Sequence, residues 1–139
     1  MKIAIINGPN LNLLGKREPE VYGKETFEDF LQDLIDHYPQ VEFSYFQSNV
    51  EGELINEIQK LGFDYDGIIL NPGGYTHTSV ALGDAIAAIT TKVVEVHISN
   101  IFSREDFRKI SHVSGKSAGV ISGLGLKGYE LALGWFIHH

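Results

Sequence analysis

The sequence predicts an α/β fold in which helices cover both faces of a parallel sheet. Strand-like and helix-like segments alternate along the chain, and the strand-like segments are continuously apolar, as is typical of such sheets. Five strands favour the flavodoxin-like order 2-1-3-4-5, a three-layer sandwich. The sequence contains no internal repeat and no interdomain linker, and 139 residues fit one domain. We therefore expect residues 1–139 to form a single domain.

The predicted strands are short and apolar. They cover residues 3–6, 41–46, 67–70, 92–96 and 119–121. The predicted helices cover residues 26–37, a second segment marked by apolar residues at 54, 55, 58 and 61, and residues 79–89 and 126–137. Apolar residues of the first helix recur at i, i+3, i+4, i+7 and i+8, the spacing of an amphipathic helix.

Capping residues support four of these helix boundaries. Thr26 followed by Asp29 resembles a capping box. We expect Ser48 or Asn49 to open the second helix and Gly62 to close it. Thr78 or Ser79 is expected to cap the third helix, whose small residues suit close packing on the sheet or on another subunit.

Composition excludes several classes of function. A net charge of −7 argues against a nucleic-acid partner, and 43% hydrophobic residues argue against disorder. The absence of cysteine removes disulfides and thiol nucleophiles and fits a reducing cytoplasm. We find no signal segment and no apolar run of about 20 residues, so we expect a cytoplasmic protein that does not contact membranes.

The segment after the first strand, residues 7–23, is the most unusual part of the chain. It is several times longer than the usual strand-to-helix loop of about 2–6 residues, and such loops are often functional lids. It contains Arg17 and Tyr22. A guanidinium near the phenol lowers the tyrosine pKa from its usual value of about 10, so this pair is a plausible proton-abstracting device.

Polar residues follow the predicted strands, where ligands bind in open α/β sheets. Asn10 follows the first strand, Asn71 and His77 follow the third, and Glu95 and His97 close the fourth. Glu95 and His97 leave the same face of their strand, and a carboxylate beside a histidine suits a general acid. The alternative is a pair that only caps the strand end.

Two further segments offer ligand-binding groups. Residues 71–79 combine a glycine turn with side-chain donors, although an ordinary turn with a surface His77 is a compatible interpretation. The amides of Ile98 and Ser99 are able to bind a carboxylate. Arg104 and Arg108 are either ligand contacts or part of a solvated helix face with i,i+4 ion pairs, and the second interpretation is favoured for Arg104.

The sequence predicts neither a cofactor nor a metal. Residues 123–128 match G-x-G-x-x-G, but no further strand and no acidic residue about 20 positions on follow them, so we expect no dinucleotide site. The histidines form no ligand cluster, and no G-x-S-x-G elbow occurs.

Taken together, five segments resemble the type II 3-dehydroquinate dehydratases. They are NGPNLNLLG at 7–15, REPEVYG at 17–23, QSNVEG at 47–52, NPGGYTHTS at 71–79 and EVHISN at 95–100 with the arginine-containing residues 104–108. Their order and spacing cover essentially the whole chain, which is far more specific than any single motif.

The resemblance implies dehydration of 3-dehydroquinate to 3-dehydroshikimate through an enolate, in the shikimate or quinate route, without metal or cofactor. It implies that Tyr22 is the base and that Arg17 lowers its pKa. Asn10 would hold the water that stabilises the enolate. His97, oriented by Glu95, would donate a proton to the leaving hydroxyl.

The resemblance also implies binding roles. Asn71, His77 and Arg108 would hold the substrate's oxygens, and the amides of Ile98 and Ser99 would hold its carboxylate. Residues 1–139 would then be one catalytic domain.

Members of this family assemble as dodecamers, which are tetramers of trimers. An aspartate from a neighbouring subunit reaches their active site, and Asp84 matches that position. Gly83 departs from the arginine often found beside it, and Gly74 stands where alanine is common.

Two other classes of function stay open at this point. One is a flavodoxin-like module for flavin or nucleotide, which would need a phosphate-binding loop that residues 7–23 do not resemble. The other is a carboxylate-binding sensor without catalysis, which the set Tyr22, Arg17 and His97 disfavours.

Overall fold

The computed structural model describes residues 1–16, 20 and 24–138. Its centre is one parallel sheet of five strands in the order β2-β1-β3-β4-β5, as the sequence predicts. The strands are β1 (Lys2–Asn7), β2 (Glu42–Gln47), β3 (Gly67–Asn71), β4 (Val93–His97) and β5 (Gly119–Ser122). The three inner strands are almost completely buried, which explains their continuously apolar sequences.

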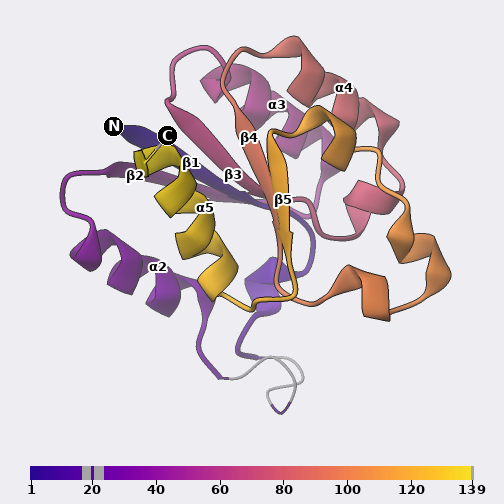
Figure 1. The fold of residues 1–139 in the computed structure, drawn as a ribbon, viewed down its shortest axis with the longest axis horizontal. Helices are drawn as coiled ribbons and strands as arrows, with labels where there is room; N and C mark the ends of the chain where they lie inside the picture. Colours follow the sequence, from indigo (N-terminus) through magenta and orange to yellow (C-terminus); the bar gives the residue numbers. More distant parts are fainter. Residues whose placement is uncertain (17–19, 21–23, 139) are drawn as a thin grey trace.

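Helices form a layer on each face of the sheet (Figure 1). On one face lie α2 (Phe27–His37) and α5 (Lys127–His138), and on the other lie α3 (Glu51–Leu61) and α4 (Val80–Ala88). Alternate residues of β1 divide between these layers: Ile3 and Ile5 pack with α2 and α5, and Ala4 and Ile6 with α3 and α4.

The caps of α2 and α4 follow the sequence. The Thr26 hydroxyl accepts a hydrogen bond from the Asp29 amide, and the Asp29 carboxylate accepts one from the Thr26 amide, which completes the predicted capping box. Ser79 caps α4 by accepting a hydrogen bond from the Leu82 amide.

The predicted start of α3 is wrong. The helix begins at Glu51, its N-cap is Val50, and neither Ser48 nor Asn49 occupies the cap position. The Ser48 hydroxyl instead accepts from the Val50 amide and bonds to the Glu53 carboxylate, so its side chain stabilises the turn that precedes the helix. Gly62 ends the helix as predicted.

Short 3₁₀ turns connect the remaining elements: η1 (Leu11–Leu13), η2 (Gly73–His77), η3 (Ile101–Ser103), η4 (Asp106–Lys109) and η5 (Ser114–Lys116). The solvated α-helix considered for Arg104 to Arg108 is absent, and only η4 forms there. In the part of the chain that the structure describes, no helix combines the length and apolarity needed to cross a bilayer.

Residue 83 brings α4 unusually close to the connection between β4 and β5. A Cβ added at Gly83 would lie 2.2 Å from the carbonyl oxygen of His112. A side chain at this position would force the backbone at His112 to move. Glycine therefore allows the segment around His112 to pack directly on α4.

Gly67 gives a direct test of packing between β3 and α5. An added Cβ would lie 2.6 Å from ring atoms of Phe136, in a buried layer with little room. We expect Gly67→Ala to lower the free energy of unfolding by about 1–3 kcal/mol, measured by urea denaturation.

Gly52→Ala is the matched control, because an added Cβ at Gly52 on α3 meets nothing within 4 Å. It should leave stability unchanged or raise it slightly. Equal stability of the two variants would contradict the close contact between Gly67 and Phe136.

Candidate active site

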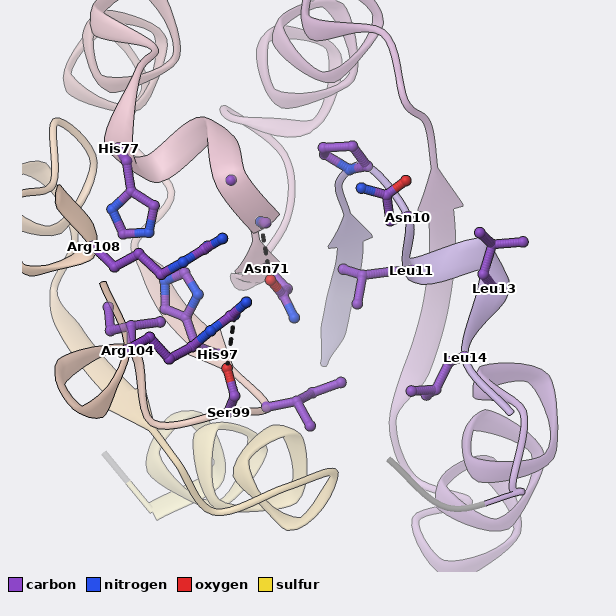
Figure 2. Close-up of a pocket in the computed structure, with 15 residues that line it drawn as sticks. Asn10, Leu11, Leu13, Leu14, Asn71, His77, His97, Ser99, Arg104 and Arg108 are labelled. Carbon is purple, nitrogen blue, oxygen red and sulfur yellow. Dashed lines mark hydrogen bonds between the residues drawn. The ribbon is translucent and has the colours of Figure 1, made fainter. Parts of the chain in front are cut away.

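A pocket of about 210 Å³ lies where β1, β3 and β4 end, the edge at which the sequence places its ligand-binding groups. Three segments form its walls: the turn after β1, the η2 turn after β3, and the chain that leaves β4 (Figure 2). The lining residues are Pro9, Asn10, Leu11, Leu13, Leu14, Asn71, Gly73, Gly74, His77, His97, Ile98, Ser99, Ile101, Arg104 and Arg108.

Most of the residues singled out from the sequence meet in this pocket. Those that line it are Asn10, Asn71, His77, His97, Ile98, Ser99 and Arg108. Glu95 lies behind His97, completely buried. Asp84 is exposed on α4 and does not line the pocket. Arg17 and Tyr22 lie outside the described residues, so their predicted roles stay predictions.

Glu95 and His97 form the buried acidic and basic pair of the site. They are two residues apart on β4, so their side chains leave the same face. The Glu95 carboxylate accepts a hydrogen bond from His97 Nε2, and His97 is only 5% exposed. This bond fixes the Nε2–H tautomer of neutral His97 and leaves Nδ1 as the ring atom available to a ligand.

Hydroxyl groups complete the surroundings of the Glu95 carboxylate. Thr76 donates to Oε2 at 2.7 Å, and Ser114 donates to Oε1 at 2.6 Å. Burial by itself raises the pKa of Glu95, but the hydrogen bond and charge of His97, with the bonds from Ser114 and Thr76, outweigh burial and hold the pKa below its usual value. The carboxylate is therefore ionised beside His97.

A second buried network holds Asn71. Its side-chain oxygen accepts from the Gly73 amide at 3.1 Å, and its Nδ2 donates to the Tyr129 hydroxyl at 2.9 Å. Tyr129 in turn donates to Asn7 Oδ1 at 2.7 Å. Tyr129 is completely buried, and burial raises its pKa far above the usual value, so it is a neutral donor here. The Asn71 amide is thus held at the pocket wall by α5.

The backbone also orients His77. Its Nδ1 donates to the carbonyl oxygen of Ile110 at 2.8 Å, because a carbonyl only accepts. Neutral His77 therefore carries its proton on Nδ1 and offers Nε2 as an acceptor. Phe107 packs edge-on against the ring, with centroids 5.8 Å apart.

Two arginines place positive charge at the pocket in a protein whose net charge is −7. Arg108 Nε lies 3.2 Å from a Glu105 oxygen, and its guanidinium stacks over Phe107 at 4.9 Å. Arg104 lies 3.8 Å from the same oxygen and donates to the Ser99 hydroxyl at 3.4 Å. Both side chains extend across the same wall (Figure 2). Arg104 is also exposed and paired with Glu105, so it lines the pocket and faces solvent at the same time.

Backbone donors lie beside these arginines. Within the described part of the chain, no acceptor is hydrogen-bonded to the amides of Ile98 and Ser99. Across the pocket, Asn10 has a left-handed backbone with φ of 72°, and its amide donates to Asn49 Oδ1 at 3.0 Å. Guanidinium groups, amides and imidazoles suit a small anionic ligand that carries hydroxyl groups.

Sequence reasoning missed several supporting residues. Thr76 lies inside the recognised turn 71–79, but nothing distinguishes it there from any other buried threonine. Ser114 and Tyr129 reach the site from 19 and 58 residues away from their partners, Glu95 and Asn71. Among the described residues, no three histidines or carboxylates gather in a way that would hold a metal ion.

Comparisons with known proteins agree with this geometry. The family described as dehydroquinase class II matches residues 1–137. A 3-dehydroquinate dehydratase from Fusobacterium nucleatum is 53% identical over 100% of this chain and 98% of its own length. One from Polynucleobacter asymbioticus is 58% identical over 94% of this chain and 90% of its own length.

A solved structure gives the same result for the fold. The type II dehydroquinase from Butyrivibrio crossotus is 47% identical and superposes with a TM-score of 0.91, over 99% of this chain and 97% of its own. The matched residues 1–137 include all five strands and every residue that lines the pocket. The chain therefore belongs to the class II dehydroquinase family.

Proposed function

We propose that this protein dehydrates 3-dehydroquinate to 3-dehydroshikimate in the shikimate pathway, with Tyr22 as the base and His97 as the acid. The substrate is a small carboxylate with several hydroxyl groups. The polar groups of the pocket suit such a molecule, since arginines and backbone amides bind carboxylates, and amide and imidazole side chains bind hydroxyls.

In the proposed reaction, the Tyr22 phenolate removes a proton from C2 and an enolate forms. Arg17 stabilises the phenolate by its charge, and Asn10 holds the water that stabilises the enolate oxygen. The position of Asn10 in the pocket wall supports this role.

His97 then donates a proton to the hydroxyl that leaves C1. Its Nε2 is bonded to Glu95, so Nδ1 is the atom that carries this proton in the imidazolium form. The ionised carboxylate stabilises the imidazolium and holds the ring in one orientation. Asn71, His77 and Arg108 hold the substrate's hydroxyls, and the amides of Ile98 and Ser99 hold its carboxylate.

The observation that carries the proposal is the buried Glu95–His97 pair at the base of a donor-rich pocket. Adding 3-dehydroquinate to the chelator-treated protein tests it, because the product's conjugated enone absorbs in the ultraviolet. A growing band supports dehydration without a metal. Binding without a band favours a sensor, and the absence of binding contradicts the proposed substrate.

We also propose a dodecamer in which Asp84 serves the pocket of a neighbouring subunit. Asp84 is exposed on α4 and does not line the pocket of its own chain, which supports a role across an interface. This arrangement makes each active site depend on two chains.

Replacing the base tests the central chemical step. Tyr22→Phe removes only the phenolic oxygen, so we expect turnover to fall by roughly 10²–10⁴-fold, while binding of a substrate analogue by calorimetry stays near the wild-type value. Tyr38→Phe is the matched control, because its hydroxyl bonds to Glu130 away from the pocket. A Tyr22→Phe protein with near-normal turnover would show that another group is the base.

Replacing the carboxylate tests its charge. In Glu95→Gln, His97 loses its anionic partner, and we expect kcat to fall by roughly 10²-fold or more. Because the folded-state pKa of Glu95 is lowered, its ionised form stabilises the protein above the unfolded value of about 4.3. This contribution is lost as the pH falls through the lower folded pKa.

Urea midpoints of wild type and Glu95→Gln should therefore differ at pH 7 and converge at acidic pH. A gap that stays constant down to the lowest pH at which the protein folds would mean that the Glu95 charge has no stabilising partner.

Mixing two inactive variants tests the shared active site. Asp84→Ala and His97→Ala should each have low activity, but a mixed oligomer contains pockets with His97 from one chain and Asp84 from the other. We expect activity to return when the two proteins are unfolded together and refolded, compared with each refolded alone. No recovery in a confirmed mixed oligomer would place Asp84 outside its neighbour's site.

A further inference from the structure

The Glu95 carboxylate is held by a chain of hydroxyls that the family chemistry described above does not use. Thr76 and Ser114 donate to its two oxygens, and Thr76 Oγ1 lies 2.6 Å from the Ser111 hydroxyl. Thr76 is completely buried. These hydroxyls come from η2 and from the connection between β4 and β5, so two separate segments converge on one carboxylate.

Every hydrogen bond in this chain points toward Glu95. Thr76 has one hydroxyl hydrogen and gives it to the carboxylate, so Ser111 is the donor in the bond between Thr76 and Ser111. The Ser111 oxygen accepts from the amides of Val113 and Ser114, at 3.0 and 2.9 Å. The arrangement fits an ionised carboxylate, because each oxygen of Glu95 faces a donor.

Packing fixes the segment that carries the two serines. The His112 amide donates to the Thr76 carbonyl oxygen at 2.8 Å, which joins this segment directly to η2. Val113 is completely buried with residues of α3 and α4. Gly83 allows α4 to approach the carbonyl of His112, where any side chain would collide.

We infer that Thr76 and Ser111 are positioning residues for His97, acting through the Glu95 carboxylate, with Ser114 supporting its other oxygen. The inference rests on the proposed role of His97 as the acid. The hydroxyls hold the carboxylate ionised and aimed at Nε2, which keeps Nδ1 directed at the substrate. None of the three lines the pocket, so they affect the reaction without touching the substrate.

Other charged groups surround the pair and are unchanged in the tests that follow. Arg104, Arg108 and His77 line the same pocket as His97, and Glu105 neutralises part of the arginine charge. His112 is exposed on the segment that carries the serines.

Thr76 offers the sharpest test because it has two informative replacements. Thr76→Val keeps the shape of this completely buried side chain and removes the hydroxyl. Thr76→Ser keeps the hydroxyl and removes a methyl. We expect Thr76→Val to lower kcat by roughly 10- to 100-fold with KM changed little, the effect of losing one hydrogen bond to a charged group.

The pH dependence separates positioning from a general loss of stability. Because the proposed base Tyr22 has to be deprotonated and the proposed acid His97 protonated, the basic limb of the kcat profile is the one that reports loss of the His97 proton. Thr76→Val removes a donor to the carboxylate, whose negative charge then stabilises the imidazolium more strongly, so this limb should move to higher pH by about one pH unit. Thr76→Ser should keep the wild-type profile.

Thr91→Val is the control for loss of a buried threonine hydroxyl. Thr91 is 9% exposed, and its hydroxyl donates to the Tyr65 carbonyl at the opposite end of β4 from His97. It should lower the urea midpoint and leave the kcat profile unchanged. A Thr76→Val profile that matches wild type, or a Thr76→Ser protein that loses as much activity as Thr76→Val, would overturn the inference.

Ser111→Ala keeps the inference testable if Thr76→Val does not fold. Ser111 is only partly buried and bonds to the Thr76 hydroxyl instead of to the Glu95 carboxylate, so a smaller shift of the basic limb in the same direction is expected. An unchanged profile would overturn the inference for Ser111.

Nitrogen-15 spectra of the His97 ring follow the same protonation step without substrate. A His97 protonation step that moves in Thr76→Val, while the wild type fails to dehydrate 3-dehydroquinate, would overturn the proposed function and leave the hydroxyl chain supported. A step that does not move, in an active wild type, would overturn only the hydroxyl chain.

Discussion

The buried carboxylate of Glu95 is the constraint on which the site depends. An ionised group without solvent is strongly unfavourable unless donors replace the water that it loses. Glu95 is completely buried, and its donors come from β4, from η2 and from the connection between β4 and β5. The charge of one side chain therefore requires three separate segments of the chain to hold fixed positions.

The two hydrophobic layers of the fold support opposite sides of the pocket through this kind of bonding. On the face covered by α2 and α5, Tyr129 joins Asn71 to Asn7 and so links the ends of β3 and β1. On the face covered by α3 and α4, Thr76 joins η2 to β4, and Ser114 joins the connection between β4 and β5 to β4. Residues of both layers therefore hold pocket residues in place: Tyr129 holds Asn71, and Thr76 and Ser114 hold the carboxylate that bonds to His97.

The alternation of five strands with helices predicted the sheet order. Periodicity predicted most element boundaries, because the inner strands are buried on both faces and α2 is amphipathic. The start of α3 could not be read in this way. Ser48 is a good N-cap by residue type, but its hydroxyl bonds locally to the Val50 amide and the Glu53 carboxylate. Hydrophobic periodicity does not show whether a serine hydroxyl caps the helix or bonds within the turn before it.

The same limit applies at the site. Topology predicts that residues after parallel strands meet, and it brought Asn71, His77 and His97 to one pocket. It says nothing about which hydroxyl 19 residues away will reach a buried oxygen, as Ser114 does. It also gave no reason to expect that Arg104, an exposed residue, would line the pocket.

Two kinds of ion pair lie at the pocket, and they differ in solvent exposure: the Glu95–His97 pair is buried, and the pairs of Glu105 with the arginines are exposed. The bond between Glu95 and His97 is shielded from water, so separating the pair would leave an uncompensated buried charge. The Glu105 carboxylate that pairs with Arg104 and Arg108 is more than half exposed, and such pairs contribute little. An anionic ligand is therefore able to replace Glu105 as the arginines' partner while the buried Glu95–His97 pair stays in place. The positive charge of the two arginines at the pocket is therefore enough to attract an anion to a protein whose net charge is negative.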